Sequence, residues 1–155
     1  MLKKAEIVVF FGCSMRGGHG AVSLEELAKL PDLIEGLGYK LASRHQTTQG
    51  VIAEENKIPA TSVHNRDYRW LQEAHLGVFE ISNPSLGVGA EIADMLHEGK
   101  AVLCLFQGDE NSISAYIRGK QGSRIVGAPL ECHRYGTLKE AEDIISRFVE
   151  SHMQH

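Results

Sequence analysis

The chain has 155 residues, of which 43% are apolar and 23% charged, with 16 Lys and Arg against 20 Asp and Glu. This length suits one ordinary domain and is too short for two full ones, so we expect a single domain over residues 1–155. The composition excludes a disordered chain, which would be poorer in apolar residues. The net charge of −4 argues against a nucleic acid polymer as partner, because binding one requires a basic face.

Cysteine usage and the N-terminus bear on the compartment. Cys13, Cys104 and Cys132 are odd in number and widely spaced, so they form neither a disulfide framework nor a Cys-x-x-Cys zinc pattern. Free thiols favour the cytoplasm. The apolar run at Ile7–Phe11 is too short for a signal peptide, and no stretch approaches the length of a membrane span. We therefore expect a cytoplasmic protein without a membrane partner.

The N-terminal half alternates signals for strands and helices. The apolar run Ile7–Phe11, which ends at Gly12, is typical of a buried parallel strand. After a polar, glycine-rich loop, Ser23 and Glu26 form a capping box that predicts the start of a helix. Pro31 should kink or restart this helix. The next features in chain order are the end of this helix at Gly36 and Gly38, a weak strand over Tyr39–Ser43, a mainly loop segment over His45–Val63 and a helix over Asn65–Ala74.

The C-terminal half continues this alternation. In chain order it predicts a strand over Leu76–Ile81, a glycine-bearing loop over Ser82–Gly89, a helix over Glu91–Glu98, a strand over Ala101–Phe106 and a short helix over Ser112–Arg118. A fifth strand is expected over either Ile125–Val126 or Glu131–Tyr135, and Thr137 with Glu140 forms the capping box of a last helix. This order predicts a doubly wound α/β fold: a parallel five-stranded sheet with helices on both faces, flavodoxin-like or Rossmann-like.

The first glycine-bearing loop should lie beyond the carboxyl ends of the strands, where such sheets bind ligands. It carries Ser14, Arg16 and Gly17 ahead of a helix N-terminus, and this arrangement suits a phosphate group. The loop matches neither the Walker A sequence nor the dinucleotide fingerprint, so a plain connecting loop is the alternative.

Carboxylates point to a second feature of the expected crevice. Glu91 is expected in the first turn of its helix, where the dipole should lower its pKa and keep it ionised, as a nucleophile requires. Ordinary helix stabilisation is the alternative. Asp67 is expected as the N-cap of the preceding helix, and two acids with separate roles are the arrangement of retaining glycosidases. The histidines show no compact ligand spacing, so we expect no metal, and His45 follows a strand toward the crevice.

Three stretches of sequence carry a resemblance to a known family. They are F-F-G-C-S-M-R-G-G at 10–18, R-D-Y-R-W-L-Q-E-A at 66–74 and E-I-S-N-P-S-L-G-V-G-A-E-I at 80–92. Together with V-L-C-L-F and S-A-Y-I-R-G further on, they resemble the 2′-deoxynucleoside 5′-phosphate N-hydrolases of the wider nucleoside 2-deoxyribosyltransferase group. The most specific part is P-S-L-G-V-G-x-E.

The resemblance implies roles for individual residues. Glu91 would be the nucleophile that attacks the anomeric carbon of a nucleotide, and Asp67 would orient the sugar or act in proton transfer. His45 would lie near the base, and Ser114 would complete the phosphate site of the neighbouring subunit in a homodimer. No cofactor is implied. The pocket for the 5′-phosphate and the sugar would be lined by Ser14, Arg16, Gly17, Ser85 and Gly87.

Phe10 departs from the family pattern, which has a tyrosine at this substrate-binding position. The missing hydroxyl would either weaken the positioning of Glu91 or leave room for a ribose 2′-OH. The main expectation is therefore an N-glycoside hydrolase of (deoxy)nucleoside 5′-monophosphates, and a ribonucleotide-preferring, CMP-type hydrolase is one alternative. Two others are a deoxyribosyltransferase acting on unphosphorylated nucleosides, which Arg16 and the serines disfavour, and a non-catalytic nucleotide-binding module.

Overall fold

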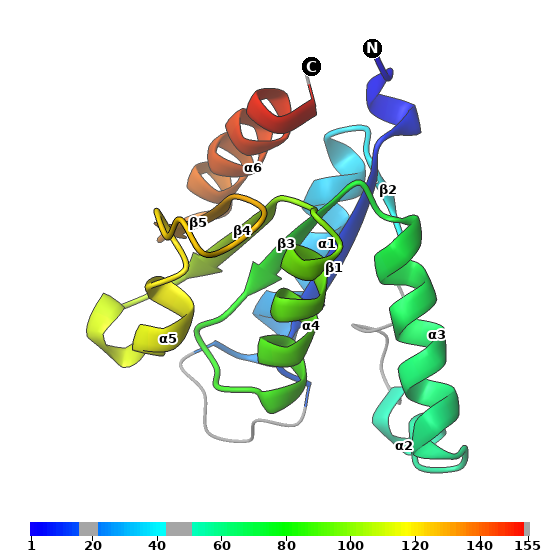
Figure 1. Cartoon of the computed structure of the whole chain (residues 1–155). Helices are drawn as coiled ribbons and strands as arrows, with labels where there is room; N and C mark the ends of the chain where they lie inside the picture. The colour runs from blue at the N-terminus through cyan, green and yellow to red at the C-terminus, as the bar shows by residue number, and fades with distance from the viewer. Residues whose placement is uncertain (16–21, 43–50, 154–155) are drawn as a thin grey trace.

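Five parallel strands form one sheet in the order β2-β1-β3-β4-β5 (Figure 1). The computed structural model describes residues 1–15, 22–42 and 51–153. The strands are β1 (Val8–Cys13), β2 (Lys40–Leu41), β3 (Leu76–Glu80), β4 (Val102–Phe106) and β5 (Leu130–Arg134). This is the flavodoxin-like strand order, so the predicted fold class is confirmed.

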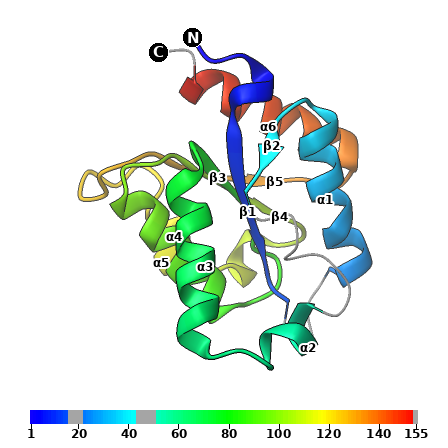
Figure 2. The ribbon, with the colours of Figure 1, turned by 90° about the vertical axis from the view of Figure 1, so that its right-hand side faces the viewer.

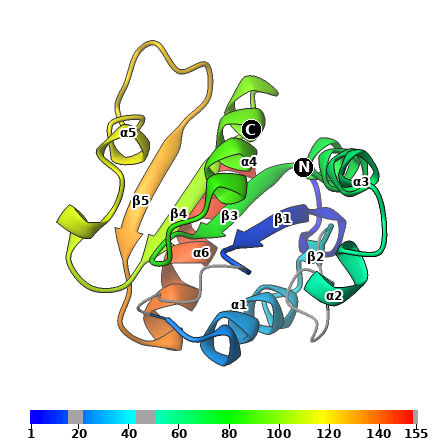
Figure 3. The same ribbon diagram turned by 90° about the horizontal axis from the view of Figure 1, so that it is seen from below.

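Helices cover both faces of the sheet, as Figures 2 and 3 show from two further directions. One face carries α1 (Leu24–Gly36) and α6 (Leu138–Met153). The other carries α3 (Ala60–Glu73), α4 (Leu86–His97) and α5 (Ala115–Arg118). The remaining elements are α2 (Val51–Glu55) and the short 3-10 helices η1 (Lys4–Glu6) and η3 (Glu110–Ser112). No helix within the described residues is long and apolar enough to cross a membrane.

The central strands are buried on both faces, which explains their continuous apolar sequences. Along β1, Val9 and Phe11 pack in the core under α1 and α6. Phe10 points the other way and packs in the core under α3 and α4. The same alternation holds along β4, where Leu103 and Cys104 belong to opposite cores.

Two sequence predictions near β1 and α1 need correction. Gly12 was expected to end the first strand, yet β1 continues through Gly12 to Cys13. A side chain at position 12 would bring its Cβ to within 2.7 Å of the Phe79 ring, so glycine here permits close packing rather than a turn. Helix α1 does not restart at Pro31 but runs through it as one element, beginning at the predicted capping box of Ser23 and Glu26.

Other boundaries follow the sequence more closely. Helix α1 ends at Gly36, and Gly38 adopts a positive φ of 97° in the turn to β2. Helix α3 is an exception, because it begins at Ala60 and not at the expected Asn65. The last strand takes the second of its two expected positions, and Thr137 Oγ1 accepts a hydrogen bond from the Glu140 backbone N–H at 3.1 Å at the start of α6.

Candidate active site

The chain reverses its direction of travel across the sheet between β1 and β3. From β1 it passes outward to β2, and then crosses back to β3, which also pairs with β1. In α/β sheets of this kind, ligands bind beyond the carboxyl ends of the strands at such a reversal. This is the place where the sequence analysis expected the two glycine-bearing loops to meet.

Hydrogen bonds join these two loops. Ser14, which is buried, donates through its hydroxyl to the Pro84 carbonyl at 3.3 Å. The Asn83 side chain is also buried: its amide nitrogen donates to the Val22 carbonyl at 2.7 Å, and its oxygen accepts from the Val22 N–H at 3.1 Å. The loop between β3 and α4 is thus held against the segments that leave β1 and enter α1.

Helix α4 begins earlier than the sequence suggested. It starts at Leu86, with Ser85 as N-cap, whose Oγ accepts a hydrogen bond from the Val88 N–H at 3.2 Å. Gly87 and Gly89, which were expected in a loop, lie in its first turn. Glu91 consequently lies in the second turn, and the expectation that it occupies the first turn was wrong. The helix dipole acts more weakly there, because its effect fades beyond the first turn.

Glu91 and Asp67 line the same cavity, of about 190 Å³, between α3 and α4. Each helix contributes four residues at positions i, i+3, i+4 and i+7, which share one helix face. From α3 these are His64, Asp67, Tyr68 and Leu71, and from α4 they are Gly87, Ala90, Glu91 and Asp94. The small residues Gly87 and Ala90 leave room beside Glu91, so two carboxylates with expected catalytic roles line one cavity.

Asp67 is held by its neighbour on α3. The Arg66 Nε donates to Asp67 Oδ1 at 2.9 Å, and Arg66 Nη2 donates to Glu55 Oε1 at 2.7 Å. The guanidinium also lies over the Trp70 ring, 4.9 Å from its centroid. Asp67 was expected as an N-cap, which was wrong: Pro59 is the N-cap and Asp67 lies in the middle of α3. This ion pair anchors the carboxylate at the wall of the cavity.

Two ring side chains on α3 were missed by the sequence analysis. His64 stacks on Tyr68 with ring centroids 5.7 Å apart, and both line the cavity. The Tyr68 hydroxyl donates to Oε1 of Glu98, the residue that follows α4, at 2.7 Å. This hydrogen bond raises the pKa of Tyr68. The bond ties α3 to the end of α4 and fixes the spacing of the cavity walls. A predicted helix that began at Ala60 would have placed His64 on the same helix face as Asp67, three residues further on.

Ser85 and Ser114 line a second cavity, of about 590 Å³, on the other face of α4. Ser114 is the N-cap of α5, and its Oγ accepts from the Ile117 N–H at 3.5 Å. The walls are largely apolar and include Val88 and Ile92. Ser114 and Glu91 of one chain therefore lie on opposite sides of α4.

The remaining expected residues differ in what can be said of them. Phe10 is 0% exposed and packs against Phe79 with ring centroids 5.7 Å apart, so it is a core residue in this structure. Arg16, Gly17 and His45 lie outside the described residues. Their expected roles stay predictions.

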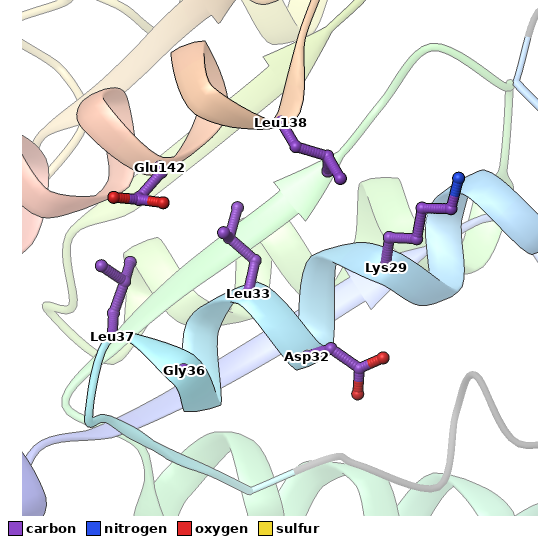
Figure 4. Close-up of a pocket in the computed structure, with 7 residues that line it drawn as sticks. All are labelled: Lys29, Asp32, Leu33, Gly36, Leu37, Leu138 and Glu142. Atoms are coloured by element: carbon purple, nitrogen blue, oxygen red, sulfur yellow. The ribbon is translucent and has the colours of Figure 1, made fainter.

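A cavity between α1 and α6, of about 450 Å³, contains none of the expected residues. Leu33 of α1 and Leu37, which follows α1, point toward α6, where Leu138 and Glu142 lie (Figure 4). Its charged lining residues are Lys29, Asp32 and Glu142. Because the expected acids gather between α3 and α4 instead, we place the candidate active site there. In the described part of the chain no group of three His, Cys, Asp or Glu side chains is arranged to hold a metal ion.

A buried carboxylate that the sequence analysis missed closes β3. Glu80 is 1% exposed; its Oε1 accepts from the Ser82 N–H at 2.6 Å, and its Oε2 accepts from the Tyr135 hydroxyl. It is the register partner of Cys13 at the end of β1. Burial, followed by the charges of Glu80 and Glu91, raises the pKa of the Cys13 thiol to about 12. Glu80 thus holds the start of the β3–α4 loop through its hydrogen bond with the Ser82 N–H.

Replacing Glu80 by Gln should flatten the dependence of stability on pH. Burial raises the Glu80 pKa more than the bonds from Tyr135 and Ser82 lower it. The folded state therefore binds the proton more readily than the unfolded state, and the stability of the wild type should rise as pH falls through the raised pKa toward the ordinary value of about 4.3. The measurement is urea denaturation of both proteins from about pH 8 to about pH 5.

The test is the slope of the unfolding free energy against pH, not the constant difference in stability between wild type and Glu80→Gln. Tyr135→Phe removes the hydroxyl that stabilises the charged carboxylate, so it should destabilise the fold by about 1–3 kcal/mol near neutral pH and by less in acid. Parallel curves for wild type and Glu80→Gln would show that Glu80 does not titrate over this range.

Comparison with known proteins relates this site to a family. No family model matches the chain. A Rattus norvegicus protein named 5-hydroxymethyl-dUMP N-hydrolase is 30% identical over 154 residues, covering 97% of this chain and 90% of the relative. A Thermofilum pendens protein that carries the name 2′-deoxynucleoside 5′-phosphate N-hydrolase 1 is 39% identical over 112 residues, covering 72% and 76% of the two chains.

A solved structure shares the fold. The Clostridium botulinum CMP N-glycosidase BcmB matches with a TM-score of 0.62 and 19% identity, over 91% of this chain and 98% of that one. At this identity the match concerns the architecture. The sequence relatives carry the assignment further, because they match the chain over most of both lengths. The chain belongs to the 2′-deoxynucleoside 5′-phosphate N-hydrolase family.

Proposed function

We propose that this enzyme hydrolyses the N-glycosidic bond of (deoxy)nucleoside 5′-monophosphates and releases the free base and (deoxy)ribose 5-phosphate. The observation that carries the proposal is the cavity in which Asp67 and Glu91 lie together, in a chain whose relatives are named for this reaction. The three free cysteines support the cytoplasm as its compartment.

Glu91 is the proposed nucleophile. Its carboxylate attacks the anomeric carbon from the face opposite the base, and the base leaves with the electrons of the glycosidic bond and takes up a proton. Asp67 orients the sugar or exchanges that proton. Water then attacks the glycosyl ester, restores the Glu91 carboxylate and delivers the sugar phosphate. The small residues Gly87 and Ala90 leave room beside Glu91 for the sugar.

The start of α4 is the proposed phosphate site. Its first N–H groups point outward, and the Ser85 hydroxyl accepts from the Val88 N–H and so keeps its own proton to donate. Glu91 lies five residues further along the helix, which is a rise of about 7.5 Å and comparable with the length of a pentose phosphate. Ser14, beside Pro84, joins this site, and Arg16, Gly17 and His45 complete the proposed contacts to phosphate, sugar and base.

A homodimer is the second part of the proposal. The family resemblance assigns Ser114 to the phosphate site of the neighbouring subunit. In this chain Ser114 shares a cavity with Ser85, whereas Glu91 lies on the other side of α4. Leu86 and Tyr116, which are 97% and 79% exposed, line the apolar cavity beside Ser114. Large exposed apolar side chains around a cavity are typical of a surface that another protein covers.

Mixing two inactive variants should restore activity if Ser114 acts across the dimer. In a mixed dimer of Glu91→Gln and Ser114→Ala subunits, one site combines an intact Glu91 with an intact Ser114. We expect about the activity of one wild-type site per mixed dimer, measured by base release after refolding the two variants together. Each variant refolded alone is the control, and activity no higher than the average of the two would place Ser114 in its own subunit's site.

The departure at Phe10 leaves two candidates for the sugar of the substrate, deoxyribose and ribose. The deoxynucleotide hydrolases are represented among the sequence relatives, and the fold neighbour is named for CMP. Phe10 lacks the phenolic hydroxyl of the family pattern, and it is fully buried against Phe79 rather than lining the cavity of Asp67 and Glu91. The ribonucleotide-preferring hydrolase therefore stands as the second candidate for the substrate.

Base release, followed by chromatography, tests the proposal. The panel contains dCMP, dGMP, dUMP, 5-hydroxymethyl-dUMP, CMP, GMP and the matching nucleosides, without added metal. Release from monophosphates alone supports the hydrolase, and the ratio of deoxy to ribo substrates decides the role of Phe10. Release that requires a nucleoside and an acceptor base would indicate a transferase instead. Binding without release would indicate a non-catalytic module.

A further inference from the structure

Two cysteines outside the proposed active site face each other across β4 and β5. Cys104 and Cys132 are direct partners in the parallel register, and both contribute to the core on the α3–α4–α5 face. Neighbouring strands lie about 4.8 Å apart. That separation falls within the Cα distances of about 4.4–6.8 Å that disulfides bridge. The backbone therefore needs little movement for a bond between the two sulfurs.

The two thiols have different surroundings. Cys104 is fully buried, whereas Cys132 is half-buried and lines an open cavity of about 560 Å³. A hydrogen bond with Cys104 and the charge of Arg118 lower the Cys132 pKa, while the same pairing and burial raise that of Cys104. An oxidant can thus reach Cys132, whose pKa is lowered, whereas the fully buried Cys104 is shielded from it.

The cavity in front of Cys132 carries positive charge. Its charged lining residues are Arg118, Arg134 and the single acid Glu110, so the arginines outnumber the carboxylates. Arg118 is fixed, because its Nε donates to the Ile113 carbonyl at 3.2 Å, and the Arg134 guanidinium lies over the Phe106 ring. The Cys132 backbone is held as well, since its N–H donates to Gln121 Oε1 at 2.7 Å. Partly exposed cysteines in electropositive surroundings are the reactive ones.

We propose that Cys132 and Cys104 form an oxidisable dithiol, in which Cys132 attacks a hydroperoxide and Cys104 resolves the product to a disulfide. The Cys132 thiolate attacks one oxygen of hydrogen peroxide, so an S–O bond forms, the O–O bond breaks and hydroxide leaves, to be protonated to water; Cys132 is then a sulfenic acid. The Cys104 thiol then displaces this hydroxyl as a second water. Two thiols and one peroxide give one disulfide and two waters, with both electrons passing from sulfur to peroxide.

Peptide mapping of the oxidised protein tests this proposal. The reduced full chain is treated with hydrogen peroxide, quenched at intervals by acid, alkylated under denaturing conditions and digested for mass spectrometry. We expect a cross-linked pair of peptides holding Cys104 and Cys132, with oxidation at Cys132 at least about tenfold faster than at Cys13, whose thiol is buried and has a raised pKa.

Three single variants separate the steps. In Cys104→Ser, Cys132 should stop at the sulfenic acid, which dimedone traps. In Cys132→Ser, Cys104 should remain reduced over the same time. Cys13→Ser is the matched control and should form the disulfide at the wild-type rate. Oxidation of Cys13 at an equal or greater rate, or of Cys132 without cross-linking to Cys104 in the wild type, would overturn the proposal.

Discussion

Glu91→Gln should abolish base release while leaving nucleotide binding within about threefold of the wild type, because the proposed phosphate contacts lie elsewhere. Gln keeps the size of the side chain at the α3–α4 cavity but provides no carboxylate to form the glycosyl ester. Loss of a covalent nucleophile lowers kcat by about 10⁴-fold or more. The measurements are kcat by chromatography and the Kd of the monophosphate by calorimetry.

Two further variants make this result specific. Glu150→Gln removes an exposed carboxylate from α6 and should leave kcat unchanged. Glu91→Ala opens space at the same position, and azide added to it should yield a glycosyl azide if an external anion replaces the missing carboxylate. A Glu91→Gln enzyme that kept kcat within about a hundredfold of the wild type would remove Glu91 from the role of nucleophile.

The central strands were predictable because a strand buried on both faces has a continuous run of apolar residues. β1, β3 and β4 lie between two helical layers, so almost every side chain is apolar whichever way it points. β2 is only two residues long and lies at an edge of the sheet, where neither of its side chains is fully buried, so apolar residues are not required. Its weak signal reflects a real lack of buried residues.

The start of α4 was not predictable from residue preferences alone. Gly87 and Gly89 favour a loop, since glycine costs about 1 kcal/mol in a helix interior. The capping bond from Val88 N–H to Ser85 and the burial of Val88 and Ile92 on the α4 face outweigh that preference. The error placed Glu91 one turn too early in the helix. The helix dipole therefore explains less of its ionisation than the sequence analysis assumed.

The cavity itself depends on contacts between helices that local sequence does not encode. Asp67 and Glu91 were identified separately, through resemblance and position, but their meeting in one cavity follows from the packing of α3 on α4. His64 and Tyr68 carry a readable signal, the i, i+4 spacing on one helix face. It becomes visible once α3 is extended to Ala60. Glu80 had no such signal, since its partners come from distant Tyr135 and from the backbone.

Asp67→Asn should lower kcat by roughly 10²–10⁴-fold, the usual contribution of a group that exchanges a proton in the transition state. The side chain keeps its size and its place on the cavity wall but can no longer take up or release a proton at this position. The limb of the pH–rate profile that belongs to Asp67 should disappear with it. Asp143→Asn, an exposed acid on α6, is the control and should leave kcat and the profile unchanged.

Arg66 distinguishes proton transfer from simple binding by Asp67. Its Nε bond to Asp67 Oδ1 and its stacking on Trp70 both hold the carboxylate in place. Arg66→Met keeps an apolar stem over Trp70 but removes the charge beside Asp67, so it should shift the Asp67 limb of the profile to higher pH, because a carboxylate without its cation binds a proton more readily. If Asp67 only orients the sugar, Asp67→Asn raises KM with the pH profile intact, and Arg66→Met shifts no limb.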